Sequence, residues 1–163
     1  MFSIGEHLIH PGQGVCTVTG FKDTPTPMLI LEAGSGHKKT QLMYPVAQSD
    51  RLHPAISREA AEELIDHYND LECDDFTERN ANLEETYFKQ LIKHGAPDTV
   101  RVVKTMRHRI RSAEQHSRKP SSYYARVLKE ARRRSLEELA CALECTEEHV
   151  EELLEAQVAA SEN

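Results

Sequence analysis

The placement of glycine and proline constrains the fold of this 163-residue chain more than any other sequence feature. Every glycine except Gly95 lies before residue 57, where Gly and Pro separate short apolar runs such as residues 8–9 and 29–31. Short apolar runs bounded by turn residues are typical of β-strands. So few residues can bury an apolar face only by curling the sheet, which predicts a small barrel of about five strands over residues 1–54.

From Ser57 onward the apolar residues recur at helical spacing, as Ala61, Leu64, Ile65 and Tyr68 show. Caps and breakers divide this part into about five helices. The first begins at Ser57, the second spans 77–94, the third starts at Pro97 and stops before Pro120, the fourth is capped by Ser121 or Ser122 and runs to about Leu143, and Thr146 caps a short fifth before a frayed tail. The sequence therefore predicts an α+β chain, with an all-helical domain at 57–163.

Charge is strongly segregated along the chain, although the formal net charge is only −7. Residues 57–98 hold four basic and twelve acidic residues, and residues 135–163 hold nine acids and no base. Between them, residues 99–134 hold nine Arg, three Lys and two Glu. Because exposed charge runs usually contribute only solubility, one interpretation is a salt-bridge lattice between basic and acidic helices.

The favoured interpretation is contact with the nucleic-acid backbone, since almost no acid lies four residues from the basic ones and guanidinium groups bind phosphate with paired donors. The candidate DNA-binding residues are Lys104, Arg107, Arg109, Arg111, Arg118 and Lys119. Arg107 and Arg111 share one helix face, whereas Arg109 lies roughly opposite. No base-reading motif is present, so binding is expected to be independent of sequence.

Other function classes find little support in the sequence. No apolar run is long enough to cross a bilayer, and residues 1–12 lack the basic and apolar regions of an export signal, so we expect a cytoplasmic protein without membrane or small-molecule partners. Cys141, Cys145 and His149 have the spacing of a helical metal site, but Thr146 is expected to break the helix there. No nucleophile, base and orienting group occur together, so neither an enzyme nor a cofactor is expected.

The segment "FSIGEHLIHPGQGVCTV" resembles the amino terminus of the CarD/CdnL family of bacterial transcription regulators. "LMYPV" at 42–46 is similar to a later strand of that family, and "PSSYYARVLKEARRRSLEELA" at 120–140 is similar to its Ser-capped helix. The resemblance implies an SH3- or Tudor-like barrel that docks on the β subunit of RNA polymerase. It also implies a helical domain that contacts promoter DNA and modulates initiation.

Two features depart from that family. The family typically has a Trp wedge in its helical domain, whereas this chain has no Trp and offers Phe76, Tyr87 or Phe88. Met43 stands where the family often has an Arg that reaches polymerase. We expect polymerase to bind an exposed edge strand at Lys38, Lys39, Gln41, Met43 and Tyr44. The alternative function is a protein-interaction adaptor with a structural charge lattice and no DNA binding.

Overall fold

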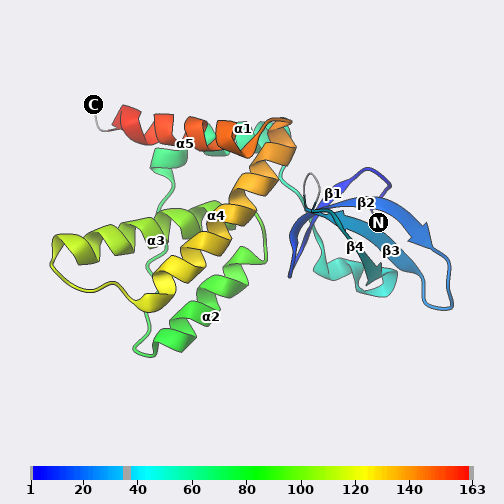
Figure 1. The fold of residues 1–163 in the computed structure, drawn as a ribbon, viewed down its shortest axis with the longest axis horizontal. Coiled ribbons are helices and arrows are strands. Elements are labelled where there is room, and N and C mark those ends of the chain that lie inside the picture. Colours follow the sequence, from blue (N-terminus) through cyan, green and yellow to red (C-terminus); the bar gives the residue numbers. More distant parts are fainter. Residues whose placement is uncertain (1, 35–37, 162–163) are drawn as a thin grey trace. The chain divides into compact units, whose positions relative to one another are not determined.

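The computed structural model describes residues 2–34 and 38–161 and divides the chain into two compact units, Met1–Ala55 and Ile56–Asn163 (Figure 1). The first unit is a β-sheet and the second is helical. The structure thus confirms the predicted α+β class, with the change from strands to helices close to Ser57. In the described ranges, none of the helices is long and apolar enough to cross a membrane.

The sheet of the first unit has five antiparallel strands in the order β4-β3-β2-β1-β5. The strands are β1 His7–His10, β2 Gly14–Lys22, β3 Met28–Ala33, β4 Thr40–Pro45 and β5 His53–Pro54, with a 3-10 helix, η1 Val46–Arg51, before β5. Consecutive strands from β1 to β4 are neighbours, and β5 returns to pair with β1. This order leaves β4 and β5 at the two edges of the described sheet.

Alternating side chains of the strands build the core of the sheet unit. In β3, Leu29, Leu31 and Ala33 are buried, whereas the residues between them are half-buried on the other face. The pairing register shifts between Val18 and Gly20, which marks a bulge in β2. Apolar side chains at every second position of the strands lie on one face of the sheet, and this face forms the small core of the unit.

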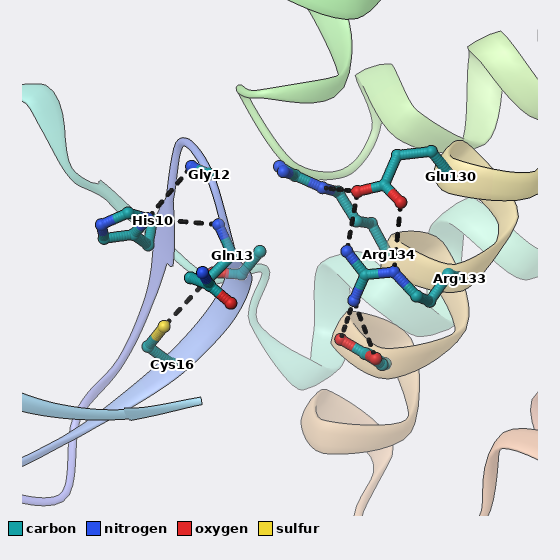
Figure 2. A network of polar contacts seen from close by, with 9 residues as sticks. His10, Gly12, Gln13, Cys16, Glu130, Arg133 and Arg134 are labelled. Carbon is teal, nitrogen blue, oxygen red and sulfur yellow. Dashed lines mark hydrogen bonds and ion pairs between the residues drawn. The ribbon is translucent and has the colours of Figure 1, made fainter. Parts of the chain in front are cut away.

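The tight turn between β1 and β2 is held by a side chain. His10 Nδ1 accepts hydrogen bonds from the backbone N–H groups of Gly12 and Gln13, at 3.0 and 3.2 Å (Figure 2). Gly14, which follows the turn, has a φ of 88°, a conformation that residues with a Cβ rarely adopt. The local chemistry of "HPGQG" thus sets the hairpin that joins the first two strands.

Residues 56–161 of the second unit form five α-helices and one short 3-10 helix. These are α1 Arg58–Asp66, η2 Tyr68–Asp70, α2 Ala81–Ile92, α3 Asp98–Gln115, α4 Ser122–Leu143 and α5 Glu147–Ser161. Ser57 caps α1 by accepting from the Ala60 N–H, and Thr146 accepts from the His149 N–H at the start of α5. Both caps are those predicted from the sequence.

Helix α4 is the centre of the helical unit (Figure 1). Its first half packs with α2 and α3 around Phe88, Met106 and Tyr123, which are almost completely buried. Its second half packs with α1 and α5 around Leu139 and Val150. The two cores share α4, so this one helix joins the two halves of the helical unit.

A buried carboxylate on α4 holds two irregular segments. Glu138 is 2% exposed and accepts hydrogen bonds from the N–H groups of Ile56 and Ala96, at 2.8 and 2.7 Å. Ile56 begins the helical unit, and Ala96 lies in the turn between α2 and α3. Burial raises the pKa of the Glu138 carboxyl, although the two backbone donors oppose that rise.

Three predicted helix limits were wrong. Helix α2 begins at Ala81 and not at residue 77, because Asn80 supplies the cap by accepting from the Asn82 N–H at 2.8 Å. Helix α3 ends at Gln115, before Ser117, whose φ of 53° cannot continue a helix. Helix α5 is not short: it continues to Ser161, with Val150, Leu154 and Val158 packed in the second core.

Candidate polymerase-binding edge and nucleic-acid interface

Strand β4 offers an unpaired edge. One side of β4 pairs with β3, with Met43 opposite Ile30 and Gln41 opposite Glu32. Within residues 2–34 and 38–55, no strand pairs with its other side. An open strand edge presents N–H and C=O groups to which a partner strand can bond.

The predicted polymerase-binding residues divide between the two faces of β4. Lys38, Lys39 and Gln41 are exposed, and Met43 is 48% exposed. Tyr44 is half-buried on the core side and makes an edge-to-face contact with His10, with ring centroids 5.5 Å apart. Lys39 forms an exposed ion pair with Glu32 at 3.4 Å. Met43 and the half-buried Ile30 form an apolar strip on the outer face, whereas Tyr44 supports the strand from within.

Among the candidate DNA-binding residues, Lys104 is occupied by internal contacts. Its Nζ donates to the backbone carbonyls of Tyr68, Asn69 and Leu71, at 2.8, 3.1 and 2.7 Å. The ammonium also lies 5.0 Å from the centre of the Tyr68 ring. Lys104 therefore binds the end of η2 and has no N–H group left for phosphate.

Arg109 is also internal, with its side chain 13% exposed. It forms an ion pair with Glu84 at 3.0 Å and donates to the carbonyls of Asp74, at 3.2 Å, and Phe76. Glu84 also accepts from the hydroxyl of Tyr123, whose pKa is raised by burial and by this hydrogen bond. Arg109 thus ties the irregular segment 71–80 to α3, so the predicted phosphate contact at this residue does not fit the structure.

Several cations of α4 form ion pairs, as the lattice interpretation predicts. Arg133 bridges Glu130, three residues before it, and Glu137, four residues after it, and Arg134 also contacts Glu130 (Figure 2). The hydrogen bond from Arg133 lowers the pKa of Glu130 below its usual value. Arg126 pairs with Glu85 at 2.7 Å, and Arg132 pairs with Glu151 of α5. Arg126 and Arg132 therefore join α4 to α2 and α5, whereas Arg133 and Arg134 pair with acids of α4 itself.

Four of the six candidate DNA-binding residues remain at the surface. Arg107, Arg111, Arg118 and Lys119 are exposed, and no acid of the described part of the chain forms an ion pair with them. Arg107 and Arg111 lie beside Tyr68, where both oppose the rise that burial causes in its pKa. Arg118 and Lys119 lie in the segment between α3 and α4. We call these four residues the exposed cation set.

The three aromatic candidates for the wedge, Phe76, Tyr87 and Phe88, are all engaged in contacts within the helical unit. Phe88 is completely buried, and Phe76 stacks on Tyr87 with ring centroids 4.0 Å apart. The hydroxyl of Tyr87 donates to Asp74 at 2.8 Å. Leu83, in the first turn of α2, is 57% exposed. It was not predicted, because a leucine in a helical stretch normally belongs to a core.

The cysteines do not form a metal centre in the part of the chain that the structure describes. Helix α4 ends at Leu143, and Glu144 adopts a left-handed conformation with a φ of 52°, so Cys141 and His149 lie on different helices. Burial raises the pKa of the Cys141 thiol, which keeps that side chain in its neutral form.

A five-stranded antiparallel sheet joined to a separate helical unit defines a two-domain α+β protein whose sheet carries an open edge. Residues 2–56 match the family model of the CarD-like/TRCF RID domain. The N-terminal unit is thus a CarD-like domain, a type that interacts with the β subunit of RNA polymerase. This confirms the resemblance for the N-terminal part of the chain. The match spans about a third of the chain and leaves the helical unit outside it. No curated protein matches the chain.

Proposed function

We propose that this protein regulates transcription initiation by binding RNA polymerase and promoter DNA at the same time. The CarD-like domain supplies the polymerase contact, and the exposed cation set supplies the DNA contact. The observation that carries the proposal is the combination, in one chain, of a polymerase-interacting domain with four exposed cations that lack acidic partners among the described residues.

The edge of β4 is the proposed polymerase-binding surface. Backbone groups of an edge strand give affinity in strand addition, and outward side chains add selectivity. Here Gln41 and Met43 point outward, with the apolar strip of Met43 and Ile30 beside them. An apolar contact at Met43 replaces the charged contact that the family often makes at this position.

The exposed cation set is the proposed DNA-binding surface. Its members contact phosphate groups and not base edges, because the sequence carries no base-reading motif and Arg and Lys bind the backbone of any sequence. Leu83 is the one large apolar side chain of residues 56–161 that is more than half exposed, and we propose that it takes the place of the family's Trp wedge. The protein acts by binding and not by catalysis, in the cytoplasm where polymerase meets its promoters.

Salt-dependent DNA binding tests this proposal. The variant Arg107→Gln/Arg111→Gln/Arg118→Gln/Lys119→Gln should flatten the slope of log K against log salt by about 3 to 4, since each lost phosphate contact removes about 0.9. Fluorescence anisotropy with labelled duplexes of two unrelated sequences measures the slope. The two sequences should respond alike.

The control for this experiment is Arg126→Gln/Arg133→Gln, which removes cations that are already paired with acids. It should change the slope by less than about 1 and reduce thermal stability. Two results would show that the positive charge of residues 99–134 serves the structure and not DNA binding. One is a parent protein that binds duplex DNA with no dependence on salt, and the other is an equal change of the slope in both variants. The adaptor function would then be the better description.

A further inference from the structure

A basic cleft of about 390 Å³ lies between the C-terminal half of α3 and the start of α4. Arg118, Lys119, His108 and His116 line it, together with Ser121 and Tyr124. His108 and Ser112 lie four residues apart on one face of α3, and His116 is the residue that follows the last turn of this helix. The cleft therefore gathers Arg118, Lys119 and two histidines, in addition to the ion pair of Arg109 and Glu84.

The acid that lines the cleft is already neutralised. Glu84 accepts from Arg109 and the Tyr123 hydroxyl with one oxygen, and from the Glu78 N–H at 2.8 Å with the other. Arg109 in turn is held by Glu84 and by two carbonyls. The charge that remains for a ligand is that of Arg118 and Lys119, and it increases when the histidines are protonated.

The hydrogen bonding of His116 determines what its ring offers to the cleft. Nδ1 lies 2.8 Å from the carbonyl oxygen of Ser112. A carbonyl only accepts, so Nδ1 carries the hydrogen, and Nε2 of the neutral ring has only a lone pair. The neutral ring consequently cannot donate to a phosphate through Nε2. Protonation turns Nε2 into a donor and adds a positive charge.

We propose that this cleft is a phosphate-binding subsite for nucleic acid, in which His108 and His116 strengthen the contact when they are protonated. The inference rests on the proposed function and adds to it the position of one phosphate group and a dependence on pH. The other charged or titratable groups that line the cleft are Arg118 and Lys119 of the connecting segment, Arg109 of α3, Glu84 of α2 and Tyr124 of α4. Imidazole is the side-chain group that ordinarily changes charge between pH 6 and 8.

The test is the affinity of the full chain for a labelled duplex at pH 6.0 and pH 8.0, at constant ionic strength. The phosphodiester keeps its charge over this range, so a change in affinity reports on the protein. We expect about tenfold tighter binding at pH 6.0, because a protonated ring that binds phosphate releases further counterions from the duplex. The variant His108→Gln/His116→Gln should reduce the ratio to about twofold or less.

The matched control is His67→Gln/His149→Gln, which removes two histidines that lie beside Asp70 and Glu152 and outside the cleft. It should keep the pH response of the parent. A parent that binds DNA with the expected salt slope but without a pH response contradicts the subsite and leaves the proposed function intact. An equal loss of response in both double variants also contradicts the subsite.

If the parent shows no salt-dependent DNA binding, the proposed function fails, and inorganic phosphate then decides the subsite alone. Orthophosphate at pH 6.0 should shift the imidazole NMR signals of His108 and His116 and leave those of His67 and His149 unchanged. Equal shifts at all four rings, or none, would overturn the inference.

Discussion

Replacing Arg109 with Met should lower the free energy of unfolding of the helical unit by about 3–5 kcal/mol, because it leaves a buried carboxylate without its cation. Glu84 would lose its ion pair, and the carbonyls of Asp74 and Phe76 would lose their donor. Urea unfolding followed by helical circular dichroism measures the change. Segment 71–80 should become accessible to proteolysis in the same variant, because it has no helix or strand of its own.

The control for Arg109 is Arg111→Gln, two residues further along the same helix. Arg111 is exposed and has no ion pair among the described residues, so its replacement should change the unfolding free energy by no more than about 0.5 kcal/mol. DNA affinity should fall more in the Arg111 variant than in the Arg109 variant. Equal stability of the two variants would show that the Arg109 network contributes little.

Replacing Glu138 with Gln should cost about 1–3 kcal/mol of unfolding free energy, since a buried backbone donor loses its acceptor. One oxygen would still accept from Ile56 or Ala96, but the amide NH₂ would face the other N–H. Glu152→Gln, at a side chain that is 75% exposed, is the control and should be nearly neutral. A Glu138 variant as stable as this control would contradict the role of the carboxylate.

The pH dependence of the Glu138 variant follows from the direction of the pKa. Burial raises the folded-state pKa of the carboxyl, so the stability that this group contributes is complete below its unfolded value and is lost as pH rises through the folded value. Gln does not titrate. The stability deficit of the variant should therefore be largest near pH 4 and become smaller towards neutral pH.

Local signals in the sequence were sufficient to predict the fold class and the first residues of most helices. Gly and Pro bound the strands, and Ser57 and Thr146 cap α1 and α5 as predicted, because a cap depends on residues only three positions away. The start of α2 was missed although its cap, Asn80, is local, because residues 71–80 before it form no helix and are held from a distance. Residues 71–80 are held by Arg109, which lies about thirty positions further along the chain.

A count of charges along the sequence cannot tell which of the candidate DNA-binding residues are exposed and which are bound within the protein. Helical spacing placed Arg109 opposite Arg107 and Arg111, and the structure shows that this opposite side faces Glu84 and Tyr123. Lys104 could not be separated from Arg107 in this way, because the carbonyls that it binds belong to η2 and to Leu71, which follows it. Arg126 and Arg132 pair with acids of other helices and Arg133 with acids of α4 itself, whereas the exposed cation set has no acidic partner among the described residues.

Simultaneous binding is the central claim, and the affinity of the labelled full chain for RNA polymerase, with and without promoter DNA, tests it most directly. We expect about tenfold tighter binding when DNA is present, because a tethered second contact acts at a high effective concentration. Neutralising the exposed cation set should abolish this gain and leave binding to polymerase alone unchanged. Met43→Glu should weaken binding in both conditions, whereas Gln13→Glu, in the turn between β1 and β2, should not. An equal affinity of the parent protein for polymerase with and without DNA would contradict the proposed function.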